Sequence, residues 1–218
     1  MSDVLREPLK ITAFFKDTLK DVGCLSVSGL LNKITAYADR LLLIPLSGGS
    51  AVAIYYVSSL FGKILSLLVN PVNNVILSYL VKENKKSSKA FFLSLGIGFL
   101  LCGFGFLLTL LISDPLLRCM YPQYVDEAVR YIIPSSLAAY VMVLTSIANP
   151  FVMRFCNLKW QIFLNGAFCA VFFGFGILGF CLAELMGFCI AVLLANVVKL
   201  VLIVLLFVCR ARSESLKA

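Results

Sequence analysis

Polar and basic side chains recur at helical spacing inside one long apolar stretch, residues 51–80. Steps of three and four residues place them on one face of a helix, and the set comprises Tyr56, Ser59, Lys63, Ser66, Asn70 and Asn73. A charge inside a membrane costs about 2.5–3.5 kcal/mol on insertion scales, so it faces a bundle interior or a wet cavity and marks a pathway. The stripe therefore predicts a cavity wall.

A shorter stripe runs through the preceding apolar stretch, residues 23–46, and comprises Ser26, Lys33, Tyr37 and Arg40. Lys33 lies thirteen residues before Leu46, and Lys63 lies thirteen after Ser50. At 1.5 Å per residue, both lysines are expected about 19 Å from the turn between the stretches. Like charges at one depth repel unless water or an anion lies between them. The two stripes thus favour a cavity for an anionic or sugar-rich cargo.

The last apolar stretch, residues 186–209, adds Asn196 and Lys199. Lys199 is also about thirteen residues from the same end of the bundle, which would place three lysines at one level. For Lys199 a second reading stays open, in which the ammonium pairs with a backbone carbonyl or lies in a packed seam.

Asp39 is the one carboxylate well inside an apolar stretch. Since Asp39 and Arg40 are sequence neighbours, their side chains leave a helix in different directions and do not simply neutralise each other. Two roles stay open for Asp39. It pairs with a lysine on another helix, or it binds a proton or sodium ion that is coupled to transport.

Composition identifies the class of protein that carries these stripes. Hydrophobic residues make up 61% of the 218 residues and charged residues 14%, against roughly 45–50% and 25% in soluble domains. The apolar stretches are long and continuous, unlike the alternating segments of about ten residues in membrane β-barrels. We therefore expect an all-α integral membrane protein. Its six predicted transmembrane helices are about 23–46, 51–80, 90–113, 128–153, 160–182 and 186–209.

The connections contain residues typical of turns. Ser47-Gly48-Gly49-Ser50 predicts a tight hairpin, 82–89 a polar loop, 114–127 the longest connection, and 154–159 and 183–186 short turns. Asn70-Pro71, Pro134 and Asn149-Pro150 predict bends or hinges. Glycines at 96, 98, 103, 105, 174, 176 and 179 predict close helix packing.

Residues 1–22 form a basic lead-in, which is either a weak amphipathic surface helix or a solvated linker, and residues 210–218 form a tail. Thirteen lysines and arginines lie in the lead-in, the loop 82–89, the turn 154–159 and the tail, against Arg118 and the interfacial Arg130 on the other side. By the positive-inside rule both termini are cytoplasmic, which agrees with an even number of spans.

Several kinds of chemistry are excluded or disfavoured. Histidine is absent, and the eight cysteines are scattered without a CxxC pair, so we expect no metal site and no cofactor. Membrane phosphatases and glycosyltransferases need paired carboxylates or a histidine at the interface. The one adjacent acidic pair, Asp126-Glu127, begins a predicted helix and fits dipole capping. We expect neither an enzyme nor a nucleic-acid-binding protein.

Two segments resemble a known family. Residues 37–49 read Tyr-Ala-Asp-Arg-Leu-Leu-Leu-Ile-Pro-Leu-Ser-Gly-Gly and are followed by Ala-Val-Ala-Ile-Tyr at 51–55. This resembles the polysaccharide or O-antigen flippases of the multidrug/oligosaccharidyl-lipid/polysaccharide exporter superfamily, where Asp-Arg-Leu-Leu-Leu closes one helix and a glycine turn follows. Residues 70–80 fit the same helix pair. Ala53 stands where the family has glycine, and Ser78 where it often has proline.

The resemblance implies a transporter of lipid-linked sugars in the bacterial inner (cytoplasmic) membrane, for surface polysaccharide or lipopolysaccharide synthesis. Such flippases have twelve or more helices in two bundles forming a V, and move undecaprenyl-pyrophosphate-linked oligosaccharide between leaflets. Arg40, Lys63, Lys33 and Lys199 would hold the head group while the lipid tail stays among membrane lipids. Six spans amount to half of such a transporter, matching its C-terminal half.

A second six-helix bundle is therefore expected, as a missing N-terminal half, a split partner or a second copy in a homodimer. Two other functions stay open from the sequence. The chain is a non-transporting partner that organises a glycan assembly complex through its glycine-rich faces, or it is an inactive fragment.

Overall fold

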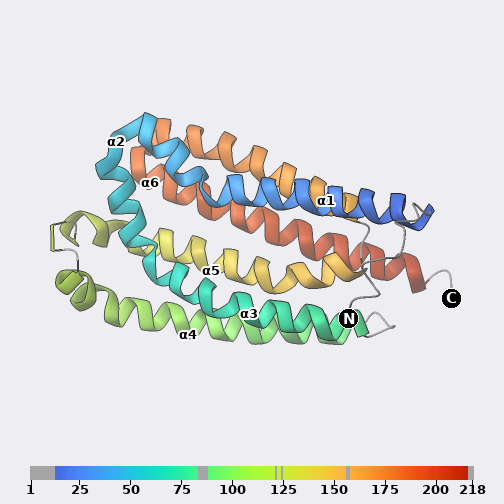
Figure 1. The fold of residues 1–218 in the computed structure, drawn as a ribbon. Helices are drawn as coiled ribbons and strands as arrows, with labels where there is room; N and C mark the ends of the chain where they lie inside the picture. The colour runs from blue at the N-terminus through green and yellow to red at the C-terminus, as the bar shows by residue number, and fades with distance from the viewer. Residues whose placement is uncertain (1–12, 83–87, 121, 124, 156–157, 216–218) are drawn as a thin grey trace, which may run out of the picture.

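The computed structural model describes residues 13–82, 88–120, 122–123, 125–155 and 158–215. These residues form six α-helices, whose bounds are α1 Ala13–Ala36, α2 Ala38–Ser58, α3 Leu60–Lys82, α4 Ser88–Met120, α5 Val125–Phe155 and α6 Leu158–Ser215. The all-α class predicted from the sequence is confirmed for this part of the chain. The helices run side by side as an elongated bundle (Figure 1).

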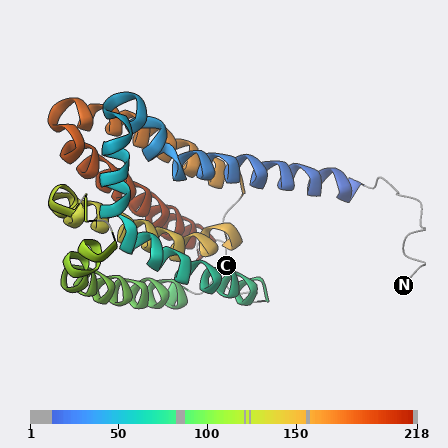
Figure 2. The ribbon, with the colours of Figure 1, turned by 60° about the vertical axis from the view of Figure 1, so that its left-hand side comes forward.

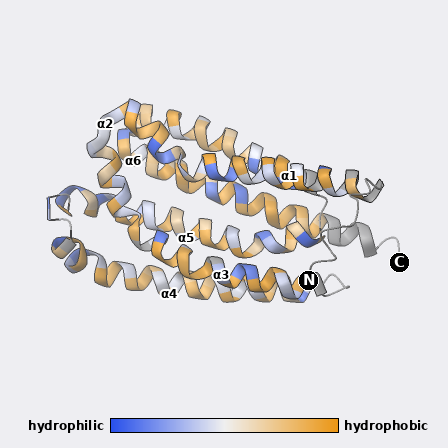
Figure 3. Cartoon of the chain, viewed as in Figure 1, coloured by the Kyte–Doolittle hydropathy of each residue, from blue (hydrophilic) through white to orange (hydrophobic). Residues whose placement is uncertain are grey.

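The bundle has an apolar outer surface. Five helical segments are long and apolar enough to cross a membrane, and they are Thr18–Ser58, Gly62–Leu80, Ser88–Cys119, Val125–Phe155 and Trp160–Cys209. Figure 3 shows apolar residues along every helix, and large side chains such as Leu100, Leu111 and Leu182 are exposed on the outside. Such a surface is stable against lipid rather than water, so the fold is compatible with a multi-pass membrane protein.

Two of the five apolar segments contain a break. α2 is interrupted at Gly48, whose φ of 81° and ψ of −178° lie in a region that L-residues with a side chain rarely adopt. α6 is interrupted at Ala183 and Glu184, and the helix folds back on itself there (Figure 1). Both breaks fall within the turns predicted from the sequence at 47–50 and 183–186.

The backbones of the two halves of α6 nearly touch beside this turn. A Cβ atom placed on Gly187 would meet the Gly179 carbonyl group, and one on Gly179 would meet the Gly187 carbonyl oxygen and the Ala191 Cβ. Gly98, Gly105 and Gly176 also lie against side chains of neighbouring helices. Close packing is thus confirmed for four of the seven predicted glycines, whereas Gly96, Gly103 and Gly174 face open space.

Two further breaks were not predicted. The predicted spans 23–46 and 51–80 are interrupted at Tyr37, with φ −109° and ψ 2°, and at Ser59, with φ −94° and ψ 1°. α3 and α5 continue as helices through Pro71, Pro134 and Pro150, so the bends or hinges expected there stay predictions. A proline removes one backbone hydrogen bond and bends a helix, which is tolerated where neighbours satisfy the freed carbonyl.

Several boundaries also differ from the prediction. α1 begins at Ala13, so part of the predicted lead-in 1–22 is helical, while residues 1–12 lie outside the described part. α4 continues through Pro115 to Met120, which shortens the predicted connection 114–127, and α6 extends to Ser215 into the predicted tail. The first residues of α1 and the last of α6 lie at the same end of the bundle (Figure 1).

α5 is the central helix and packs against α2, α3, α4 and α6. One hydrophobic core joins α2, α5 and α6 near the turns, and another, centred on Phe91, Phe151 and Phe207, lies toward the chain ends. Between these cores α1 packs mainly on α6 and α3 mainly on α5. Figure 2 shows α1 and α3 on separate flanks of the bundle. This arrangement leaves room for polar side chains between the flanks.

Candidate functional site

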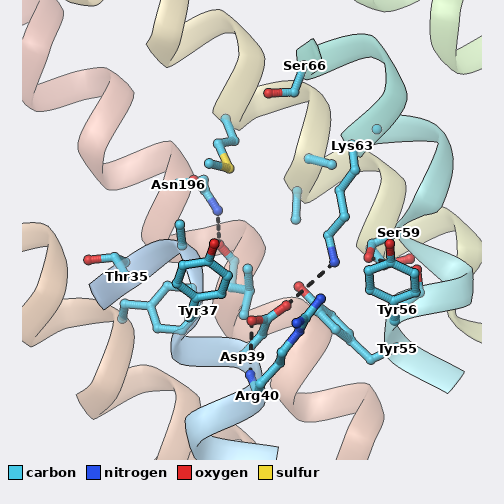
Figure 4. A pocket seen from close by; sticks show the side chains of 18 of the residues that line it. Thr35, Tyr37, Asp39, Arg40, Tyr55, Tyr56, Ser59, Lys63, Ser66 and Asn196 are labelled. Carbon is cyan, nitrogen blue, oxygen red and sulfur yellow. Dashed lines mark hydrogen bonds and ion pairs between the residues drawn. The ribbon is translucent and has the colours of Figure 1, made fainter. Parts of the chain in front are cut away.

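A cavity of about 400 Å³ lies beside the breaks at Tyr37 and Ser59 (Figure 4). Its lining comes from α1, α2, α3, α5 and α6 and includes Asn32, Thr35, Tyr37, Asp39, Arg40, Tyr55, Tyr56, Ser59, Lys63, Ser66, Ser135, Phe168 and Asn196. We call this the first cavity. The unpredicted breaks shape it, because they turn the short α2 relative to α1 and α3 and bring Asp39 and Arg40 toward Lys63.

An ion pair crosses the first cavity. Lys63 Nζ lies 3.6 Å from Asp39 Oδ2, with 39% of the lysine side chain and 13% of the aspartate side chain exposed. The backbone N–H of Arg40 donates to Asp39 Oδ1 at 2.9 Å. Asp39 lies in the first turn of α2, where a carboxylate is favoured by the helix dipole and by unpaired backbone N–H groups. Of the two roles left open for Asp39, pairing with a lysine is confirmed, and ion coupling stays a prediction.

Two cations lie near the ring of Tyr56. Lys63 Nζ is 4.3 Å from the ring centroid and Arg40 Cζ is 5.4 Å from it. Arg40 also lies 5.9 Å from the ring of Tyr37, and Lys63 lies 5.8 Å from the ring of Tyr55. The negative face of a tyrosine ring attracts a cation, an effect that strengthens when the cation loses water. The tyrosines therefore hold both basic side chains at the cavity wall.

A second cavity of about 400 Å³ adjoins the first and lies nearer the chain ends. Its polar lining comprises Ser28, Asn32, Lys33, Ser66, Thr145, Ser146, Asn149, Gln161, Asn165, Asn196 and Lys199. Both cavities share Asn32, Ala36, Ser66, Met142, Phe168 and Asn196. The two cavities therefore lie next to each other, between α1 and α6 on one side and α3 and α5 on the other, and we call the pair the polar passage.

The two basic residues of the second cavity lack a carboxylate partner. Within the part of the chain that the structure describes, neither Lys33 nor Lys199 lies within 4.0 Å of an acidic oxygen. Lys199 Nζ instead lies 4.2 Å from the centroid of the Phe168 ring. Of the three lysines expected at one level, Lys33 and Lys199 line the second cavity and Lys63 lines the first.

The structure gathers nearly all of the residues predicted for the site. Tyr37, Asp39, Arg40, Tyr56, Ser59 and Lys63 line the first cavity, Lys33 and Lys199 the second, and Ser66 and Asn196 both. The side chain of Asn70 lies outside the described residues. Asn73 departs from the predicted stripe, since it is buried between helices and its Nδ2 donates to Ser146 Oγ at 2.7 Å. The stripe ends there because α3 closes onto α5.

Sequence reasoning missed the amide side chains of the second cavity. Gln161 Nε2 donates to Asn149 Oδ1 at 2.6 Å, and Asn165 Nδ2 donates to Ser28 Oγ at 2.8 Å. Gln161 and Asn165 are four residues apart inside an apolar stretch. That spacing is the same signal that revealed the stripe containing Lys63. It was overlooked because neither residue carries charge.

The site offers binding rather than ligation of a metal. In the described ranges, no three side chains of histidine, cysteine, aspartate or glutamate gather closely enough to hold a metal ion. The described cysteines are free thiols, and Cys156 lies outside those ranges. The passage presents ammonium, guanidinium, hydroxyl and amide groups, which bind phosphates and sugar hydroxyls by hydrogen bonds.

No family model, curated protein or solved structure matches this chain. Its function is therefore inferred from the passage itself.

Proposed function

We propose that this chain is half of a membrane transporter that flips an undecaprenyl-pyrophosphate-linked oligosaccharide between leaflets for surface polysaccharide synthesis. One observation carries the proposal, which is the polar passage with four basic side chains inside an otherwise apolar bundle. Intramembrane charge is retained where a charged solute passes or binds. An anionic head group would travel along the passage while its lipid tail stays in the bilayer.

The proposed topology has six crossings. The break at Ala183–Glu184 divides the apolar segment of 50 residues into two parts that each suit a bilayer core of about 30 Å, and the residues after the break at Gly48 would continue past Ser59 into α3 to form the second crossing. The basic residues of 82–89, 154–159 and the two chain ends would then share one side. The positive-inside rule makes that side cytoplasmic, in the bacterial inner membrane.

One bundle supplies one wall of an alternating-access transporter, and the opposite wall needs a second bundle. In this proposal the second wall is an N-terminal half, a split partner or a second copy of the chain. Arg40 and Lys63 would contact the diphosphate as it moves through the first cavity, where Tyr56 holds them in place. The partially exposed Lys63–Asp39 pair leaves the lysine within reach of a ligand.

One glycine on which the alternative of a non-transporting partner depends is used inside the chain. Gly176 is buried, and a Cβ there would lie 3.0 Å from Leu42 and 3.3 Å from Phe188 of the same chain. The glycine-rich face around Gly176 is therefore used for internal packing. The residues that line the polar passage have a role in a transporter and none in the alternative, which favours the transporter.

Removal of either basic residue of the first cavity should abolish surface polysaccharide. We expect Arg40→Ala and Lys63→Ala each to lower it about tenfold or more, since a hydrogen bond to a charged group contributes about 1.5–3 kcal/mol. Surface polysaccharide is measured by antibody or lectin staining of the source cells, beside the amount of each variant in the membrane.

Lys89→Ala is the matched control, because Lys89 is exposed at the start of α4 and lies outside both cavities. It should leave polysaccharide unchanged. Normal polysaccharide in both the Arg40→Ala and the Lys63→Ala cells would refute the proposed function.

A further inference from the structure

We propose that the second cavity is the resting site of the head group, where Lys33 and Lys199 hold a phosphate and the amide oxygens of Gln161 and Asn196 accept hydrogen bonds from sugar hydroxyls. This inference rests on the proposed function and assigns the two parts of the ligand to different residues. Its chemical class is a phosphorylated, hydroxyl-rich head group.

Charge distinguishes the second cavity from the first. The first cavity is lined by Arg40, Lys63 and Asp39, and Asp39 already pairs with the lysine at 3.6 Å. No carboxylate lines the second cavity among the described residues, although Lys33 and Lys199 both do. Two ammonium groups that line one cavity without a counter-ion repel each other, and an anion bound near both removes that repulsion. The phosphate is therefore best accommodated in the second cavity.

Two buried acceptors indicate a second kind of ligand group. Gln161 is 5% exposed and Asn196 is 3% exposed, and in both side chains the NH₂ group donates within the protein. Gln161 Oε1 and Asn196 Oδ1 accept no hydrogen bond within the described part of the chain. A buried acceptor without a donor costs free energy. Phosphate oxygens are themselves acceptors and do not satisfy it, whereas hydroxyl groups do.

A ligand that satisfies both observations carries an anion and several hydroxyl donors on one small head. A sugar linked to a lipid through a diphosphate has this chemistry. The head group of an ordinary phospholipid with free hydroxyls, such as phosphatidylglycerol, has it too. A cavity of about 400 Å³ falls in the range of pockets that hold a small ligand. Both sources must therefore be compared directly.

The test is a binding titration of the purified full chain in detergent micelles. Its probes are a prenyl diphosphate that carries a sugar, the same prenyl diphosphate without sugar, a neutral alkyl glycoside of that sugar, and phosphatidylglycerol. We expect the sugar-bearing diphosphate to bind most tightly. The Lys33→Ala/Lys199→Ala double variant should weaken both diphosphates about tenfold or more, because each lysine supplies a charge-assisted hydrogen bond.

Asn196→Leu separates the hydroxyl contacts from the phosphate contacts. It keeps the branched shape of the side chain but removes Oδ1, whereas a change at Gln161 would also leave Asn149 without its donor. We expect Asn196→Leu to bind both diphosphates equally, so that the preference for the sugar is lost. Lys20→Ala, an exposed lysine of α1 outside both cavities, is the charge control and should bind as the parent does.

Each outcome bears on a different part of the account. If Lys63→Ala weakens binding and the Lys33/Lys199 double variant does not, the site is misplaced although the proposed function stands. If the bare diphosphate equals the sugar-bearing one in the parent, the hydroxyl assignment is wrong. Tightest binding of phosphatidylglycerol would identify a phospholipid as the occupant and count against the proposed function. If no probe binds the parent protein, both this inference and the proposed function are refuted.

A folding control accompanies the series. Size-exclusion profiles and melting temperatures are recorded for every variant. Lys33→Gln/Lys199→Gln, which keeps long polar side chains, replaces the alanine pair if that pair is unstable. Loss of binding in a folded glutamine pair supports the inference, and retained binding refutes it.

Discussion

Leucine in place of Gly187 should prevent the chain from folding into a stable bundle. The new Cβ would occupy the position of the Gly179 carbonyl group on the other half of α6. Because that obstacle is backbone, it has no alternative rotamer, and the hairpin at Ala183–Glu184 must open. We expect a loss of more than about 3 kcal/mol, at or above the upper end of overpacking effects. The measurements are the yield of monodisperse protein and its thermal unfolding in detergent.

Gly174→Leu is the matched control for this prediction. Gly174 is on the same helix, and a Cβ there meets nothing within 4 Å. Since leucine also has a better helix propensity than glycine, by about 0.5–1 kcal/mol, the control should fold at least as well as the parent. A Gly187→Leu protein that unfolds at the temperature of the Gly174→Leu protein would contradict the close crossing of the two halves.

Alanine in place of Asp39 should destabilise the chain, and a second change at Lys63 should restore part of the loss. Asp39→Ala leaves the Lys63 ammonium without its partner at 3.6 Å. Breaking a fully buried pair costs about 3–5 kcal/mol. Because 39% of the lysine side chain is exposed, we expect about 1–2 kcal/mol here, reduced by solvent screening. In the double variant neither charge is left alone, so the coupling energy should be about 1 kcal/mol or more.

The pair between Asp114 and Arg118 provides the control. It lies on the outside of α4, with 53% and 61% of its side chains exposed, so Asp114→Ala should leave the free energy of unfolding nearly unchanged. Unfolding in mixed micelles gives the free energies for all variants. Additive effects of the changes at Asp39 and Lys63 would mean that this ion pair contributes nothing to stability.

The first cavity could be predicted in large part because its residues are polar and lie in apolar helices. Tyr56, Ser59, Lys63 and Ser66 recur at helical spacing, and a membrane forces such a stripe inward. The turn at Gly48 was predictable from the pair of glycines between two apolar stretches. In both cases a pattern within one short stretch of sequence is sufficient to predict the structure.

The breaks at Tyr37 and Ser59 could not be read from the sequence. Neither position holds glycine or proline, and both backbones adopt dihedral angles that most residues tolerate. They depend on how α2 packs between α5 and α6. Local sequence patterns gave no signal at either position.

The second cavity depends on the meeting of separate helices. Asn149, Gln161 and Asn165 are single polar residues, and only the packing of α1, α5 and α6 brings them together. Which of the three lysines share a cavity likewise depends on how the helices pack.

The central claim is that the passage is wet and receives a lipid-linked sugar diphosphate. Ser66 lines both cavities, so Ser66→Cys places a thiol at their junction. Leu100→Cys is the control, because Leu100 lies on α4 outside both cavities with 72% of its surface exposed. A membrane-impermeant thiol reagent is applied to membranes that contain each variant, with the parent protein as background. Since only a hydrated thiol ionises and reacts, Ser66→Cys should be labelled about tenfold faster than Leu100→Cys.

Addition of a prenyl diphosphate that carries a sugar should then slow the labelling of Ser66→Cys, because the head group would cover the thiol. The same lipid should leave the slow labelling of Leu100→Cys unchanged. Fast labelling that the lipid-linked sugar diphosphate slows is the result that this account predicts. A rate equal to that of Leu100→Cys, or a fast rate that the ligand does not change, would contradict it.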